Sequence, residues 1–182
     1  MENKLRQNKQ LGIIDHTLGD NMKKSQVQQL IADRVKAVGS PLPVAFFDKM
    51  CYIESRYNPN AVSMTNCKGL FQFSSGTWKC YSSGDRLDPV KNTDAAIKLA
   101  NDNYNYLKKR LKRDPFCGEV YMAHNIGAGA AAKLILADPK LQLTRAFLGS
   151  KPEYNPKYLM AGKVPATAGV AVTRYMLDFR GI

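Results

Sequence analysis

The chain has 182 residues, of which 23% are charged and 45% hydrophobic, and its formal net charge is +12. This length suits one domain with short appendages, and the composition is that of an ordinary globular protein, which excludes collagen-like and wholly disordered chains. The absence of any apolar run near the ~20 residues of a transmembrane helix excludes a spanning segment, and the strong basic charge indicates a polyanionic partner such as bacterial cell wall, an anionic membrane or nucleic acid.

The N-terminal half of the chain begins with a polar stretch and continues with two helical patterns. Residues 1–24 are charged and contain no apolar signal core, so we expect an N-terminal arm and no signal peptide. Apolar residues at helical spacing predict helices over residues 25–38 and 44–54. Pro59 prevents further helix and favours an extended residue before it.

A long polar stretch follows the second helix. Residues 55–84 are rich in Ser, Asn, Gly and Tyr, which predicts a loop with room for a small hairpin. A short helix over residues 74–80 carries Trp78, which we expect in the core. The two aspartates of the turn at 84–89 are expected to brace that turn, and a long helix is predicted over 92–111.

The C-terminal part continues the helical pattern. Helices are predicted over residues 116–124, 128–137 and 170–179, and strand signals are few and short. The sequence therefore indicates a mainly α fold with at most a small β-hairpin. We expect the chain to divide into three parts: an N-terminal arm (residues 1–24), a folded domain (residues 25–148) and a Pro- and Tyr-rich tail (residues 149–182). The tail is expected to pack on the domain or on a partner.

Two features of the chain have unremarkable structural explanations. The basic run 108–113 is expected to be a solvated helix end, and it lacks the interleaved aromatic residues that stack on bases, so no specific nucleic-acid binding is expected. The four cysteines have no metal-ligand spacing, which predicts no zinc or other metal site and leaves two disulfides or four reduced thiols open. They are Cys51, Cys67, Cys80 and Cys117.

Three segments carry a chemical pattern. The first is Glu54-Ser55-Arg56-Tyr57-Asn58-Pro59 with Ser63 nine residues after Glu54, the second is Gly69-Leu70-Phe71-Gln72-Phe73, and the third is Ala123-His124-Asn125-Ile126-Gly127. A carboxyl group at a helix end, facing an apolar wall with one amide, can stay protonated near neutral pH. That is the form in which a general acid acts.

These segments resemble the soluble lytic transglycosylase family, whose members have Glu-Ser, a later Ser, Gly-Leu-Met-Gln and Ala-Tyr-Asn-x-Gly. The turn at 84–89 and the helix after it are most similar to such domains in phage virion proteins. The resemblance covers roughly residues 25–140 and implies a goose-type-lysozyme-like fold with a cleft between lobes. It makes residues 25–148 a catalytic domain.

The resemblance also implies roles for individual residues. Glu54 would be the catalytic acid, with no metal or cofactor. The substrate contacts would be Ser63 and Gln72 as hydrogen-bonding groups, Tyr57, Phe71 and Phe73 as apolar walls, and His124 and Asn125 from the third segment. His124 departs from the family's Tyr and adds a group that titrates near neutral pH. Gln72 has an alternative role, which is to satisfy buried backbone groups.

The spacing of acidic residues bears on the mechanism. Glycosidases usually use two carboxyl groups, yet residues 55–84 contain no Asp or Glu. This favours a lytic transglycosylase with a single Glu as acid and then base, which cleaves the bond between N-acetylmuramic acid and N-acetylglucosamine and leaves a 1,6-anhydro product. The alternatives are a hydrolytic muramidase, a non-catalytic wall-binding or virion structural protein and, more weakly, a nucleic-acid binder.

The expected setting follows from the same resemblance. We expect a phage protein that opens the wall locally during entry or serves lysis, in the virion or released into the host periplasm. Its partners would be peptidoglycan glycan strands and other virion proteins.

Overall fold

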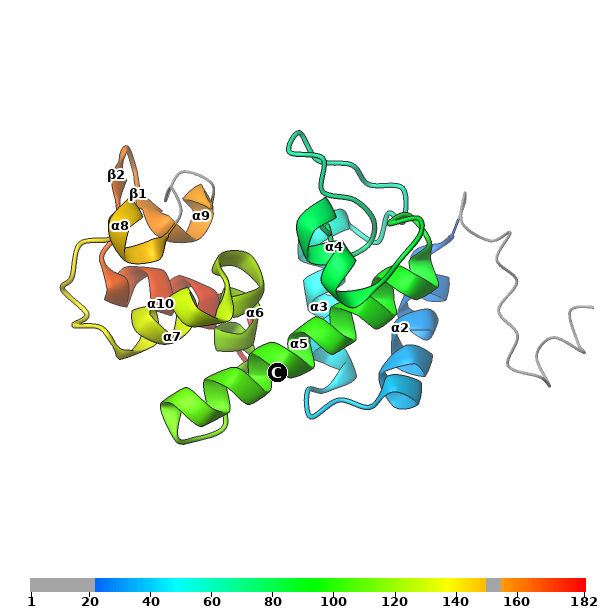
Figure 1. The fold of residues 1–182 in the computed structure, drawn as a ribbon, viewed down its shortest axis with the longest axis horizontal. Helices are drawn as coiled ribbons and strands as arrows, with labels where there is room; N and C mark the ends of the chain where they lie inside the picture. Colours follow the sequence, from blue (N-terminus) through cyan, green and yellow to red (C-terminus); the bar gives the residue numbers. More distant parts are fainter. Residues whose placement is uncertain (1–21, 150–154) are drawn as a thin grey trace, which may run out of the picture.

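The computed structural model describes residues 22–149 and 155–182, which form two groups of helices (Figure 1). The first group contains α2 (Lys24–Val38), α3 (Val44–Ser55) and α4 (Ser75–Tyr81). The long helix α5 (Pro89–Leu111) passes along the base of both groups in Figure 1. The second group is α6 (Cys117–Ile126), α7 (Ala128–Leu136), α8 (Arg145–Leu148), α9 (Pro156–Leu159), β1 (Met160–Ala161), β2 (Val164–Pro165) and α10 (Ala168–Asp178). The mainly α prediction is confirmed.

The first lobe is built from amphipathic helices that pack on the first half of α5. α2 packs against both α3 and α5, and α4 packs against α5. The apolar stripe of α2 is buried, and Arg34 on the same face forms a two-pronged ion pair with Asp94 of α5, with Nε 2.6 Å from Oδ1. Such parallel N–H···O bonds fix orientation as well as distance. The ion pair therefore sets how α2 lies on α5.

The turn before α5 has the capping role that its aspartates predicted. Asp88 accepts hydrogen bonds from the backbone N–H groups of Val90 and Lys91, each at 3.0 Å. Asp85 accepts one from the N–H of Leu87. These bonds satisfy donors that a helix start leaves unpaired, so α5 begins at Pro89, three residues before the predicted start.

The second lobe includes the described part of the predicted tail. α6 packs against α5, α7 and α10, and Tyr175 and Phe179 of the tail are buried. The contact between α6 and α10 is close at Gly118, where an added Cβ atom would lie 2.7 Å from the carbonyl oxygen of Tyr175. Residues 155–182 thus share one core with the helices before them. The boundaries at residues 24 and 149 remain predictions, and residues 1–21 of the predicted arm lie outside the described part.

Replacing Gly118 by Ala is expected to lower the free energy of unfolding by about 1–3 kcal/mol, because the new methyl group must push two packed helices apart. Gly129→Ala in α7 is the matched control, since its nearest neighbour would be the Tyr106 hydroxyl at 3.7 Å. Ala is the better helix former, so this control should gain about 0.5–1 kcal/mol. Urea unfolding of both variants measures the difference. Equal effects would contradict the close α6–α10 contact.

The β structure lies elsewhere than the sequence suggested. Residues 55–84 form only isolated bridges, in which Lys68 pairs with Val62 and with Phe73. Among the described residues the two-stranded antiparallel sheet is β1–β2, in the tail. Left-handed backbone at Asn66 and Gln72 turns the loop too often for a regular hairpin.

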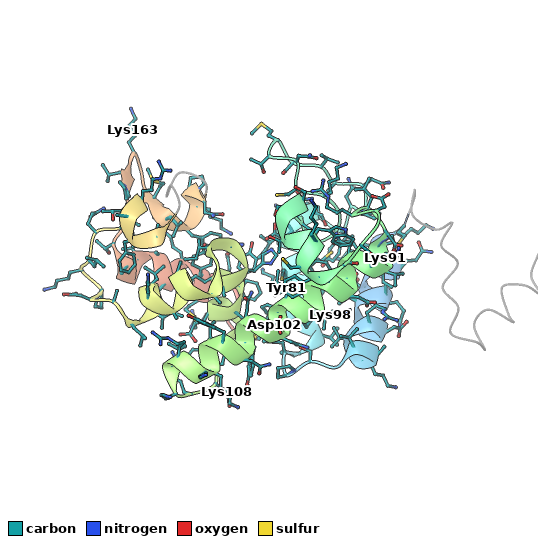
Figure 2. All side chains as sticks on the ribbon, in the orientation of Figure 1. Tyr81, Lys91, Lys98, Asp102, Lys108 and Lys163 are labelled. Atoms are coloured by element: carbon teal, nitrogen blue, oxygen red, sulfur yellow. The ribbon has the colours of Figure 1, made fainter. Side chains whose placement is uncertain are left out.

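Several smaller predictions can also be compared with the structure. Trp78 is 5% exposed and belongs to the core, as predicted. All four cysteines are free. The basic run ends α5 at the surface, where Lys108, labelled in Figure 2, pairs with Asp114 at 2.7 Å. No helix within residues 22–149 and 155–182 combines the length and the apolar character that crossing a bilayer requires.

Candidate active site

A groove of about 460 Å³ is lined by residues from both lobes. Most of its lining comes from the end of α3, the loop from residue 56 to 74, and α6. The lining is almost entirely uncharged and polar, with Phe73 and Leu99 as apolar parts. Its residues are Glu54, Ser63, Thr65, Cys67, Gln72, Phe73, Ser74, Thr77, Leu99, His124, Asn125 and Asn155.

Glu54 is placed by the abrupt end of α3. The helix stops at Ser55 because Arg56 adopts a left-handed conformation with φ 55°, and its N–H still bonds the carbonyl of Tyr52 at 3.1 Å. Tyr57 is left-handed as well, with φ 64°. Left-handed backbone is unfavourable for residues with a side chain, so packing must hold this turn in place. The turn leaves the Glu54 side chain 16% exposed, facing α6.

Two side chains of α6 approach the same carboxyl oxygen of Glu54. The Tyr121 hydroxyl donates a hydrogen bond to Oε1 at 2.8 Å. His124 Nε2 lies 3.7 Å from Oε1, which is close enough for an electrostatic interaction but too long for a good hydrogen bond. Residues three apart on a helix share a face, so α6 presents both rings to α3.

The surroundings determine the protonation of these two rings. Burial raises the pKa of Tyr121 far above its usual range, and the neighbouring Glu54 raises it further. Burial lowers the pKa of His124 from its ordinary value, and the Glu54 carboxyl partly opposes this shift. Tyr121 therefore remains a hydrogen-bond donor, and His124 is neutral at neutral pH.

The polar residues of the loop are used partly to hold the loop itself. Gln72 Nε2 donates to the carbonyl oxygens of Gly69 and Ala61 at 2.9 and 3.2 Å. Ser63 Oγ accepts a hydrogen bond from the Cys67 N–H at 3.0 Å. The alternative role of Gln72 in satisfying backbone groups is thus observed, in a side chain that also lines the groove.

Asn92 ties this loop to the start of α5. Its side chain is buried, and Oδ1 accepts a hydrogen bond from the N–H of Phe71 at 2.9 Å. Nδ2 donates to the carbonyl oxygens of Arg86 at 2.8 Å and Lys68 at 3.2 Å. Every polar atom of this amide is therefore engaged, and three chain segments meet on one side chain.

The structure brings six predicted site residues together along the groove: Glu54, Ser63, Gln72, Phe73, His124 and Asn125. Phe71 and Tyr57, which were predicted to form walls, do not line the groove. Phe71 is fully buried in the core because the Asn92 bond and the left-handed Gln72 turn its side chain inward. Tyr57 is 8% exposed and packs away from the groove, where its hydroxyl donates to Asp48 at 3.1 Å.

Sequence reasoning missed Tyr121 and Asn92. Tyr121 lies one helical turn before His124. This spacing places both side chains on one face of the helix, so it could have identified Tyr121 as a site residue. Asn92 had no signal, because a buried asparagine near a helix start has the same local pattern as an exposed one. Asn155 and Leu99 also line the groove without having been singled out.

Acidic and metal-binding groups are sparse in this region. Glu54 is the one carboxylate among the lining residues that the structure describes. Over residues 22–149 and 155–182 there is no cluster of three or more His, Cys, Asp or Glu side chains suited to a metal ion. The described site therefore offers one acid, a tyrosine donor and a neutral imidazole.

Comparison with known proteins agrees with the motif pattern. Residues 36–143 match the sequence model of the family described as Transglycosylase SLT domain. The membrane-bound lytic murein transglycosylase F of Shewanella sediminis (strain HAW-EB3) is 33% identical over 78 residues. That match covers 43% of this chain and 16% of the relative, so the chain spans a small part of the relative's length.

Proposed function

The chain belongs to the transglycosylase SLT domain family, and we propose that it is a lytic transglycosylase acting on the glycan strands of peptidoglycan. It would cleave the β-1,4 bond between N-acetylmuramic acid and N-acetylglucosamine and form a 1,6-anhydro end. The observation that supports this most is Glu54, which is 16% exposed in a groove whose described lining has no other carboxylate. A hydrolase with two carboxyl groups would need a second one within about 10 Å across the groove.

The proposed reaction uses Glu54 twice. First, its carboxyl proton passes to the glycosidic oxygen while the bond from that oxygen to C1 of N-acetylmuramic acid breaks. The N-acetyl group of the same sugar stabilises the positive charge that develops at C1. The C6 hydroxyl oxygen then attacks C1, and its proton returns to the Glu54 carboxylate, which restores the acid.

The intramolecular attack explains why no second protein carboxylate is required. The C6 hydroxyl is tethered to the reacting ring, and a well-oriented tethered nucleophile has a large entropic advantage over water. The walls formed by Phe73 and Leu99 would limit the access of water to C1. The uncharged hydroxyl and amide groups along the groove suit a sugar polymer rather than a phosphate backbone.

Product analysis tests this function. Mass spectrometry of purified murein digested with the protein should show 1,6-anhydromuramic ends, which are 18 mass units (one water) lighter than hydrolytic products, by the balance of the proposed reaction. Reducing ends would instead establish the hydrolytic muramidase. If no soluble fragments appear, the protein is a non-catalytic wall-binding or structural component.

We also propose that the protein is a phage product, carried in the virion or released for lysis, and that other virion proteins are among its partners. The likeness of residues 84–89 to phage virion domains supports this setting. The net charge of +12 suits binding to an anionic cell wall, whether the protein is carried in the virion or released for lysis.

A further inference from the structure

The two oxygens of the Glu54 carboxyl group have different surroundings. Oε1 accepts the Tyr121 hydroxyl at 2.8 Å and faces His124 Nε2 at 3.7 Å. Within the described residues, no protein hydrogen bond reaches Oε2. A neutral carboxylic acid has one oxygen with the proton and one that accepts. Because Oε1 is the accepting oxygen here, the proton is left on Oε2.

The ring of Tyr121 is held by aromatic residues of the C-terminal segment. Phe179 lies 4.9 Å from it between ring centroids, and Tyr158 and Tyr175 each lie 6.1 Å away in edge-to-face geometry. Tyr158 and Tyr175 stack on each other at 3.9 Å. These three rings come from α9, from α10 and from the residue directly after α10, shown in orange and red beside α6 in Figure 1. All of them follow residue 143, where the family match ends.

We propose that Tyr121 is a positioning residue for Glu54, which fixes the reactive proton on Oε2, and that the aromatic rings of residues 158–179 hold Tyr121 in place. This inference rests on the proposed function and assigns part of its acid site to a segment outside the family match. The hydroxyl that holds the acid comes from position 121, one helical turn before the position expected from the motif.

The arrangement serves both halves of the proposed reaction. In the acid form, the Tyr121 bond selects the oxygen that donates. In the carboxylate form, the same bond becomes charge-assisted and therefore stronger. Tyr121 thus stabilises the carboxylate that forms when the proton leaves, and keeps Oε2 free to take the proton back.

Other titratable groups near Glu54 have to be considered in any test by pH. His124 faces it from α6, Tyr175 from α10 and Cys51 from one turn earlier on α3. Burial lowers the pKa of His124 and raises the pKa of Cys51 to about 12, and it also raises the pKa of Tyr175. All three groups are then uncharged near neutral pH, so none of them adds a charge beside Glu54 there.

The test is a direct titration of Glu54 in Tyr121→Phe, which removes the hydroxyl and keeps the ring. Carbon-13 NMR of the labelled full chain follows the side-chain carboxyl resonance, assigned by its absence in Glu54→Gln. Losing a donor to the charged form should move the midpoint upward by about one pH unit. The alkaline limb of kcat on murein should move in the same direction. A purely structural role of the hydroxyl would lower stability without moving either curve.

The matched control is Tyr81→Phe, because the Tyr81 hydroxyl also donates to a carboxylate, Asp102, at 3.0 Å. Figure 2 labels this pair on α4 and α5, and neither residue lines the groove. The control should leave the Glu54 midpoint and the activity profile unchanged. An unchanged midpoint in Tyr121→Phe, or an equal shift in both variants, would overturn the proposal.

The variant Phe179→Leu tests the role of the tail, because it loosens the packing on the Tyr121 ring. We expect a smaller upward shift of the Glu54 midpoint. Leu148→Val, a buried change in α8 of the same lobe, should reduce stability without a shift. If Phe179→Leu leaves the midpoint in place, the tail does not position Tyr121. If the wild type releases no murein fragments, the proposed function fails, while the NMR midpoints still decide whether Tyr121 controls Glu54.

Discussion

Glu54→Gln is expected to reduce murein turnover by at least about a thousandfold, because general acid and base catalysis each contribute about 10²–10⁴ and one residue performs both. The amide has nearly the shape of the carboxyl group. Its oxygen can still accept the Tyr121 hydroxyl that Oε1 accepts at 2.8 Å in the wild type. What the amide lacks is a transferable proton. The thermal midpoint and the circular dichroism spectrum should therefore stay close to those of the wild type while release of soluble fragments stops.

Asp48→Asn is the matched control for this change. Asp48 is also on α3, but its carboxyl bonds Tyr57 and Gln28 and does not line the groove. The same exchange of carboxyl for amide at this position should leave kcat within a few-fold of the wild type. Turnover by Glu54→Gln within tenfold of the wild type would remove Glu54 from the mechanism. A comparable loss in both variants would point to damage of α3 instead.

Helix positions and the acid could be predicted from the sequence because both depend on local patterns. The stripe of α2 and the capping aspartates before α5 are short-range signals that packing reinforces. Glu54 was predictable because helix, turn and Pro59 follow in fixed order, and the structure places its side chain in the groove.

Side-chain direction in the loop was not predictable in the same way. Phe71 and Phe73 are two residues apart and were assigned the same role, and both are buried, yet of the two only Phe73 lines the groove. Neither helical nor strand periodicity applies where Gln72 has φ 51°. The direction is set by a bond to Asn92, 21 residues away, which no local pattern contains.

The partner of the acid was missed for a related reason. The motif drew attention to His124, whereas the hydrogen bond to Glu54 comes from Tyr121. Both lie on one face of α6, and only the rotation of that helix against α3 decides which ring reaches the carboxyl oxygen. That rotation is fixed by α10, which packs on α6 with backbone contact at Gly118 and with the Tyr175 ring beside Tyr121. Such long-range packing cannot be derived from a spacing.

Asn92→Ala is expected to be the most destabilising single substitution considered for the groove, at about 3–4 kcal/mol of unfolding free energy. Three hydrogen bonds are lost at roughly 1 kcal/mol each, and two of the groups that they satisfied, the Phe71 N–H and the Arg86 carbonyl oxygen, lose the partner that Asn92 provides. The third group, the Lys68 carbonyl oxygen, still accepts the N–H of Phe73 at 3.0 Å. The measurement is urea unfolding, followed by circular dichroism, together with murein turnover.

Two further variants determine whether the loss of stability in Asn92→Ala comes from the side-chain amide itself. Asn92→Asp keeps the acceptor for Phe71 but turns a second oxygen toward two carbonyl oxygens, so it should be about as damaging as Ala. Asn105→Ala lies on the same helix at an exposed position, and should be neutral or slightly stabilising because Ala has the higher helix propensity. If Asn92→Ala unfolds at the wild-type urea concentration and retains turnover, the loop is held by its other contacts. If both Asn92 variants are damaging and Asn105→Ala is not, loss of the Asn92 amide releases the loop from α5. The groove wall that contains Gln72 and Ser63 then depends on one buried amide outside the motifs.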